Sequence, residues 1–264
     1  MWSYYGSKSK VINFYPAPKY GKIIEPFAGS ARYALKYFDR DVLLVDKYEV
    51  IIKIWKWLQS CSPEDIKHLP EPKPREDIRN YTFDCEEAQY LMRYMIGGGL
   101  AWMQWIVSPQ GFGAGVASQK KNIANNLYRI RHWKFLHGDY SQLENEEATW
   151  FIDPPYQVGG HKYPYSNKHL NYPQLADWCK SRNGHVIVCE NTKASWLPFK
   201  AMQEMNGSLF RTTEAIWSNY PTDFDFQQMS LMGMGQANTA WSRLVEGSGN
   251  LPAVVNQSEG EKPA

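Results

Sequence analysis

The chain has 264 residues and a formal net charge of +2. This length allows one domain, or one domain with a large insertion, and it excludes a small domain that depends on disulfides or metals for stability. The weak positive charge permits an anionic partner, but it excludes a protein whose main task is to coat nucleic acid. Its 11 tryptophans and 17 tyrosines indicate a large aromatic core or a surface that stacks flat ligands.

Cysteine usage and hydropathy bear on the cellular compartment. The four cysteines are scattered, without a C-x-x-C pair and without histidines at metal-ligand spacing, so we expect reduced thiols and no metal site. No signal-peptide pattern opens the sequence, and no apolar run is long enough to span a bilayer. A cytoplasmic protein without membrane contact is therefore expected.

The N-terminal part alternates between strand and helix patterns. Residues 22–28 (KIIEPFA) predict a buried strand, and residues 31–38 (ARYALKYF) have helical spacing of apolar side chains. A second strand is predicted over 41–46 (DVLLVD) and a second helix over 48–58 (YEVIIKIWKWL). This βαβα unit indicates a parallel sheet covered by helices, whose ligands bind at the carboxyl ends of the strands. Three residues fall near that edge: Glu25, Gly29 and Asp46.

The alternation breaks after the second helix. Prolines are followed by a predicted helix over 86–96, then by the glycine- and aromatic-rich residues 97–115 and a helix over 119–133. We expect residues 61–132 to form an insertion in a domain made of 1–60 and 133–244.

Strand patterns return after the insertion. The sequence predicts a C-terminal antiparallel pair between 209–220 and 224–235, and a disordered tail over 245–264. Three further strands end in or beside polar groups: 134–139, 149–153 and 185–191.

The segment Asp153-Pro154-Pro155-Tyr156 lies where one of these strands ends. The two prolines stiffen the turn and remove two amide donors, so the carboxylate and the Pro154 carbonyl are available as acceptors. Two acceptors beside an aromatic ring suit a planar exocyclic amine, because accepting both hydrogens localises the nitrogen lone pair. The tetrapeptide alone is equally compatible with a structural turn and a core tyrosine.

Five motifs occur in order: YYGSKSK (4–10), IIEPFAGSA (23–31), LLVD (43–46), HGD (137–139) and DPPY (153–156). Together they resemble the Dam-like (D12 class, alpha group) DNA adenine N6-methyltransferases, which use S-adenosylmethionine, and they cover most of residues 2–156. Ala31 stands where that family often has a third glycine, and the insertion is shorter than in larger members. The resemblance implies an α/β fold. Its Rossmann-like class I methyltransferase sheet would be mostly parallel, with an antiparallel C-terminal hairpin and a small, mainly helical target-recognition insertion.

The resemblance also implies roles for residues at the cofactor. Gly29 would let the backbone approach the methionine part, and Asp46 would accept the ribose hydroxyls. Read alone, Gly29 fits a structural turn and Asp46 a helix cap. Asp139 would lie near the cofactor adenine. Tyr4 and Lys8 belong to an N-terminal element that closes over the cofactor, although a solvated basic terminus gives the same pattern. The full expected cofactor set is Tyr4, Lys8, Glu25, Phe27, Gly29, Asp46, Asp139 and Asp153.

The implied reaction is direct methyl transfer to the N6 amine of an adenine flipped out of the duplex. Asp153 and the Pro154 carbonyl would hold the amine hydrogens, and the base would stack on Tyr156. No metal is required.

Double-stranded DNA is the partner that this reaction implies. Trp102, Trp105 and Phe112 are either wedges for the base stack or the core of the insertion, and Gln110 and Gln119 are further candidate base readers. We expect a monomer or weak dimer, with a restriction enzyme as a possible partner. The expected DNA contacts are Arg93, Gln104, Lys120, Lys121, Arg129 and Arg131, each of which is also compatible with an ordinary solvated face.

Two alternatives stay open. The same acceptors would serve cytosine N4 or adenine in RNA, and a catalytically inactive DNA-binding module would keep the fold without binding the cofactor.

Overall fold

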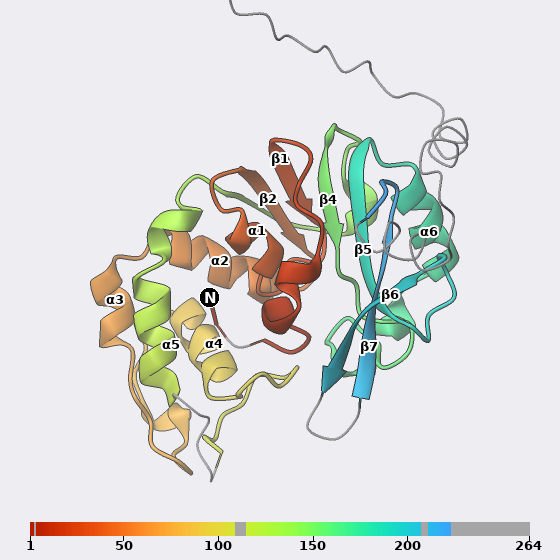
Figure 1. The fold of residues 1–264 in the computed structure, drawn as a ribbon. Coiled ribbons are helices and arrows are strands. Elements are labelled where there is room, and N and C mark those ends of the chain that lie inside the picture. Colours follow the sequence, from red (N-terminus) through yellow and green to blue (C-terminus); the bar gives the residue numbers. More distant parts are fainter. Residues whose placement is uncertain (3, 109–114, 207–210, 223–264) are drawn as a thin grey trace, which may run out of the picture. The chain divides into compact units, whose positions relative to one another are not determined.

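A seven-stranded sheet with the order β3-β2-β1-β4-β5-β7-β6 forms the centre of the structure (Figure 1). The computed structural model describes residues 1–2, 4–108, 115–206 and 211–222, of which 1–220 belong to one structural unit. The strands are β1 Lys22–Glu25, β2 Asp41–Asp46, β3 Lys134–His137, β4 Ala148–Ile152, β5 Gly184–Asn191, β6 Lys200–Asn206 and β7 Arg211–Ser218.

Strands β1 to β5 pair in parallel with one another, and β7 is antiparallel to both of its neighbours, β5 and β6. The sequence therefore predicted the fold class correctly as a Rossmann-like class I methyltransferase sheet with an antiparallel C-terminal hairpin. The central strand β4 is buried along its whole length, as its continuous apolar sequence requires.

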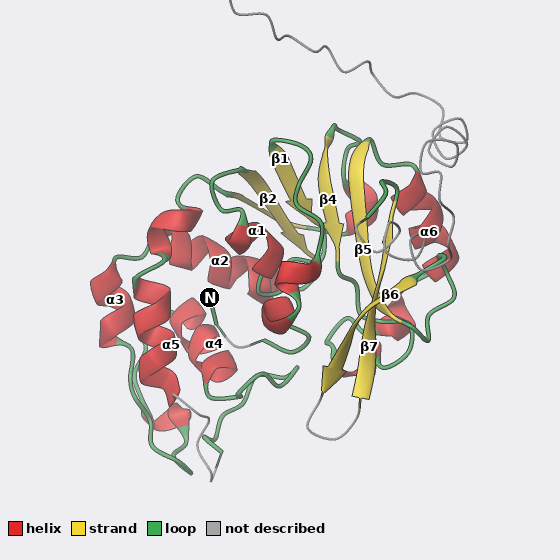
Figure 2. Cartoon of the chain, viewed as in Figure 1, coloured by secondary structure: helices red, strands yellow, loops and turns green. Residues whose placement is uncertain are grey.

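Helices cover both faces of the sheet (Figure 2). Side chains alternate along β4, so Trp150 and Phe151 point to opposite faces. Trp150 packs in the core with residues of α6 (Tyr172–Lys180), whereas Phe151 stacks on Tyr33 of α1 (Arg32–Lys36) at 4.2 Å between ring centroids. The two helices therefore enclose β4 from either side.

Helix α2 (Glu49–Ser60) packs against β2 and β3 through one apolar face. Trp55 on that face is fully buried and lies parallel to the Phe135 ring. Its indole Nε1 donates to the Gly29 carbonyl at 2.9 Å, so the helix also supports the turn after β1.

The segment between β2 and β3 is mainly helical. It contains α3 (Pro63–His68), α4 (Glu86–Met95) and α5 (Gly115–Ala124), with α3 and α4 both contacting α5, while α4 also packs against α2. The sequence analysis missed α3, which begins with a capping box between Ser62 and Asp65.

The helix predicted over 119–133 is corrected by the structure. Helix α5 ends at Ala124 and is followed by a separate 3-10 turn, Leu127–Ile130. The Asn126 side chain donates to the Asn122 carbonyl, which supplies a local alternative to the helical backbone bond.

The C-terminal hairpin also differs from its predicted pairing. Strand β7 falls within the predicted arm 209–220, but the strand beside it is β6, which precedes it and was missed. The other predicted arm, 224–235, and the predicted tail, 245–264, lie outside the described residues. Helix α6 was missed too, although Asn171 caps it and Pro173 lies in its first turn.

Within the described residues, no helix is both long and apolar enough to cross a membrane. All four cysteines are free thiols.

Candidate functional site

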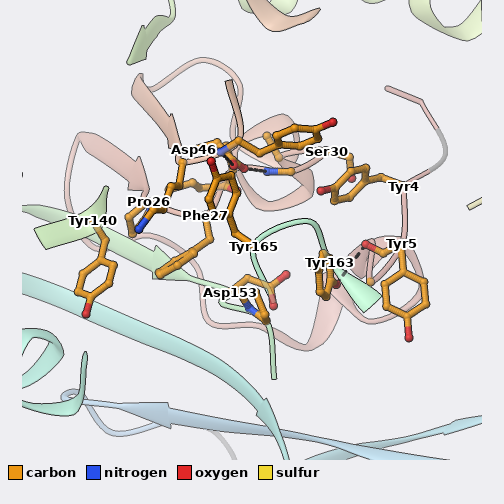
Figure 3. A pocket seen from close by; sticks show the side chains of 18 of the residues that line it. Tyr4, Tyr5, Pro26, Phe27, Ser30, Asp46, Tyr140, Asp153, Tyr163 and Tyr165 are labelled. Carbon is orange, nitrogen blue, oxygen red and sulfur yellow. Dashed lines mark hydrogen bonds between the residues drawn. The ribbon is translucent and has the colours of Figure 1, made fainter. Parts of the chain in front are cut away.

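A cavity opens at the carboxyl ends of β1, β2 and β4 (Figure 3). It contains about 890 Å³ of empty space when its open mouth is included. The N-terminal segment and the loop after β4 complete its wall. All eight residues expected at the cofactor line it: Tyr4, Lys8, Glu25, Phe27, Gly29, Asp46, Asp139 and Asp153.

The turn after β1 is shaped by Gly29 and Asp46. Gly29 has a φ of +45°, and a Cβ at this position would lie 2.9 Å from the Tyr4 ring. Asp46 Oδ2 accepts the Gly29 amide at 3.0 Å, and its Oδ1 accepts the Tyr48 amide just before α2. Burial raises the pKa of Asp46 to about 6, against the lowering effect of these two amides. A glycine cradle beside an acid that ends β2 fits a nucleoside cofactor with a small polar chain.

Glu25 is buried at the end of β1, and it contacts helix α1, which follows the same turn. Its Oε1 accepts the Ala34 amide at 2.6 Å. Burial raises the pKa of Glu25 to about 8, so at neutral pH the side chain is largely the uncharged acid. The sequence placed Glu25 at the cofactor, whereas the structure shows its hydrogen bond to helix α1.

The raised pKa of Glu25 makes a pH-dependent prediction for Glu25→Gln. The folded-state pKa of Glu25 exceeds its ordinary value of 4.5. The contribution of Glu25 to wild-type stability is therefore fully present below pH 4.5 and is lost as the pH rises toward about 8. Gln keeps an acceptor for the Ala34 amide without this loss. Chemical denaturation should find the two proteins within about 0.5 kcal/mol at pH 5 and the variant more stable by at least about 1 kcal/mol at pH 9.

Asp46 and Asp153 contribute pH dependence to both proteins, so the difference between them isolates Glu25. Glu144→Gln, at an exposed carboxylate, is the matched control and should follow wild type at both pH values. A Glu25→Gln protein that loses stability in parallel with wild type would contradict an uncharged Glu25.

Four polar side chains meet around the Lys8 ammonium, and two of them, Lys8 and Asp153, line the cavity. We call the four the lysine cluster: Lys8, Asp153, Tyr156 and Glu214. The Lys8 ammonium lies 2.8 Å from Asp153 Oδ1 and 3.4 Å from Glu214 Oε1, and it donates to the Tyr156 hydroxyl at 2.6 Å. The Tyr156 hydroxyl donates in turn to Glu214 Oε1. Lys8 is only 6 % exposed, so it does not form part of a solvated basic N-terminus.

Burial and charge oppose each other in the lysine cluster. Burial lowers the pKa of Lys8, but the charges of Asp153 and Glu214 outweigh it and hold that pKa well above its ordinary value. Burial, with a smaller effect from Glu214, raises the pKa of Asp153 to about 6, while Lys8 lowers it. The Asp153–Lys8 pair is therefore ionised at neutral pH, and the carboxylate can accept hydrogen bonds.

Two contacts fix the loop after β4. Tyr172 of α6 donates to the Pro155 carbonyl at 2.6 Å, and the buried Glu190 accepts the Gln157 amide at 2.6 Å. Among the described residues, none donates a hydrogen bond to Asp153 Oδ2 or to the Pro154 carbonyl. These are the acceptors that the sequence analysis assigned to an amine.

Tyr156, the ring expected to stack a base, belongs to the lysine cluster and is not in the wall of the cavity. Tyr156 is tied to Lys8 and Glu214, and it is not among the described residues that line the cavity. Tyr163 and Tyr165 line it instead, and in the view of Figure 3 Phe27 and Tyr165 lie between Asp46 and Asp153. Neither tyrosine was singled out in the sequence.

Glu214 was also missed. It lies on β7, where it pairs in register with Asn191, the last residue of β5. Because β7 runs antiparallel, its early residues reach the edge where the parallel strands end, which was not visible before the pairing was known.

Asp139 lines the cavity but is already engaged. It forms a 2.9 Å ion pair with Lys47 and accepts the Ser141 amide. Burial raises its pKa, but the Lys47 ammonium and the Ser141 donors bring it below the ordinary value.

The basic residues expected at DNA have varied surroundings. Lys120 is buried, and its ammonium binds the Leu69 carbonyl and Glu71, so two of its three donors are used within the fold. The Arg131 guanidinium binds the carbonyls of Gln59 and Cys61. Lys120 is thus held inside the fold, whereas the Arg131 side chain stays exposed.

The other expected DNA contacts are less constrained. The Arg93 guanidinium lies 3.8 Å above the Trp105 ring, and the Arg129 guanidinium lies 4.6 Å from the Phe38 ring. Lys121 is exposed, and Trp102 is 55 % exposed. Gln104 and Gln119 donate to the carbonyls of Trp102 and Met95, while Gln110 and Phe112 lie outside the described residues.

The chain is thus a Rossmann-like α/β protein with the class I methyltransferase sheet and a cavity at the carboxyl edge of that sheet. No protein-family model matches the chain, and no curated protein does.

Solved structures with low similarity include "Putative methyltransferase yhhF from Escherichia coli", at 8 % identity and a TM-score of 0.33, covering 79 % of this chain and 78 % of that one. A "conserved hypothetical protein" from Streptococcus pyogenes has 12 % identity and a TM-score of 0.30, covering 74 % and 84 %.

Proposed function

We propose that the protein transfers a methyl group from S-adenosylmethionine to the N6 amine of an adenine flipped out of DNA. The observation that carries this proposal is the position of Asp153. Its carboxylate lies in the same cavity as the Gly29 turn and Asp46, with Oδ1 paired to Lys8 and Oδ2 without a donor among the described residues. One cavity thus joins a cradle for a nucleoside cofactor to an acceptor for an amine.

The residues of the cradle suit the cofactor by their chemistry. Asp46 offers carboxylate oxygens for ribose hydroxyls, and the absence of a side chain at Gly29 lets the protein backbone approach the methionine part of the cofactor. When bound, S-adenosylmethionine supplies an electrophilic methyl group. Asp153 and the Pro154 carbonyl hold the hydrogens of the amine, and their attraction grows as positive charge develops on nitrogen. Tyr163 and Tyr165 are the aromatic faces available to the base.

The DNA part of the proposal rests on the motif order and on the side chains between β2 and β3. We assign phosphate or base contacts to Arg93, Gln104, Lys121 and Arg129. Lys120 is left out because it is buried and bound to Leu69 and Glu71, and Arg131 because it binds the carbonyls of Gln59 and Cys61. The exposed Trp102 ring is the available wedge.

Incubation with unmethylated duplex DNA and methyl-labelled S-adenosylmethionine, followed by mass analysis of the nucleosides, tests the proposal. Label in N6-methyladenine is the expected result. Label in N4-methylcytosine, or in RNA alone, would replace the substrate. Cofactor binding without transfer to any nucleic acid would contradict the reaction, and failure to bind the cofactor would favour an inactive module.

A further inference from the structure

Glu214 is the one member of the lysine cluster that lies outside the DPPY loop and the N-terminal segment. It is 5 % exposed, and Oε1 accepts hydrogen bonds from the Tyr15 and Tyr156 hydroxyls and lies 3.4 Å from the Lys8 ammonium. Neither the turn after β1 nor the fold of the sheet needs a charge at this place. A buried carboxylate is costly unless its charge is used, so its position calls for an explanation.

Lys8 is shared between two carboxylates, because its ammonium lies 2.8 Å from Asp153 Oδ1 and 3.4 Å from Glu214 Oε1. Tyr156 is fixed by the same oxygen, because its hydroxyl accepts from Lys8 and donates to Glu214. A loose ammonium would bridge both oxygens of Asp153 and compete with an amine for them.

We propose that Glu214 is a positioning residue for methyl transfer, which holds Lys8 on one oxygen of Asp153 and so keeps the other oxygen for the substrate amine. This role rests on the proposed function, since it acts on the amine acceptor. Glu214 does not touch the substrate in this scheme; its effect passes through Lys8 and Tyr156. The strand pairing that brings β7 beside β5 is what places it there.

The charge of Glu214 also acts on Asp153 directly. It adds to the effect of burial in raising the pKa of Asp153, whereas Lys8 lowers it. Transfer requires the Asp153 carboxylate, so the rate should fall as pH drops through that pKa. The titratable groups that face Asp153 come from several elements, namely Lys8, Tyr15, Glu25, Tyr156, Tyr163, Cys189, Glu190 and Glu214.

Single-turnover methylation rates of Glu214→Gln, measured across pH 5 to 9 on the duplex substrate, test the role. We expect the maximal rate to fall about tenfold, the size expected for one lost charge-assisted hydrogen bond, with cofactor affinity changed less than about twofold. The acid limb should move to lower pH because a negative charge near Asp153 is gone. A purely structural Glu214 would leave the limb where it is in wild type.

The matched control is Glu190→Gln, the same change at a buried carboxylate on the neighbouring strand. Glu190 holds the Gln157 amide and does not contact Lys8, and its charge is not among the main causes of the raised pKa of Asp153, so its variant should shift the acid limb less than Glu214→Gln does, whatever its rate or stability. An unshifted limb in Glu214→Gln, or an equal shift in both variants, overturns the proposal.

Glu214→Asp covers the case in which the Gln variant does not fold. It keeps the charge but shortens the side chain, so the limb should stay while the maximal rate falls, and an unchanged rate would overturn the role. Wild type is assayed alongside all three variants. Absence of methylated nucleoside with wild type contradicts the proposed function itself, whereas an active wild type with an unaffected Glu214→Gln contradicts only the role of Glu214.

Discussion

Asp153→Asn is expected to reduce methyl transfer by about 10²- to 10³-fold while leaving the fold intact. The amide has the same shape, but only one of its two heavy atoms can accept a hydrogen bond. In wild type, the Lys8 ammonium lies 2.8 Å from Asp153 Oδ1, so the oxygen of the new asparagine is expected to face Lys8. The NH₂ group of the asparagine then faces the substrate amine, and two hydrogen-bond donors oppose each other. Label in N6-methyladenine is the quantity to follow, at saturating cofactor.

Cofactor affinity separates a loss of chemistry from a loss of binding. Asp46 and the Gly29 turn are untouched by the substitution, so calorimetry should find an affinity for S-adenosylmethionine within about threefold of wild type. The matched control is Asp41→Asn at the opposite end of β2, where the carboxylate is half exposed and 4.0 Å from Lys134. A variant that keeps more than a tenth of wild-type transfer would remove Asp153 from the amine site.

Local sequence signals were sufficient to predict the strands and turns that surround the Gly29 end of the cavity. Continuous apolar strands ending in an acid or glycine place Glu25, Gly29 and Asp46 at one edge, because parallel strands share that edge whatever the rest of the chain does. Asp153 follows the same rule on β4. The motif order then assigned the sheet type, which the strand order confirms.

The features that were missed depend on long-range pairing. Glu214 joins the cluster only because β7 inserts between β5 and β6, and β6 itself carries too weak a pattern to be recognised. The burial of Lys120 depends in the same way on a carbonyl and a carboxylate about fifty residues away, at Leu69 and Glu71. Tyr156, the ring expected to stack a base, is bound to Lys8 and Glu214, whereas the chain folds back to bring Tyr163 and Tyr165 to the cavity.

Lys8→Met is expected to destabilise the protein by about 3–5 kcal/mol at pH 7, although it removes a charge from a buried place. Methionine fills a similar volume, but Asp153 and Glu214 are then left close together without their shared cation. In wild type, Lys8 lowers the pKa of Asp153 against the effect of burial, so its removal raises that pKa further above about 6. Chemical denaturation of the purified variant measures the loss.

The pH dependence identifies the cause of this loss. With a folded-state pKa above the ordinary 3.8, Asp153 binds a proton more tightly in the folded than in the unfolded protein, so the deficit shrinks as pH falls from 7 through that pKa. Lys22→Met, which breaks the partly exposed ion pair with Glu146, should cost less than about 1 kcal/mol at either pH. A Lys8→Met deficit that is equal at pH 7 and pH 5 would mean that lost packing, and not the two unpaired carboxylates, destabilises the variant. In that case Lys8 would not hold the charge balance on which the Asp153 acceptor depends.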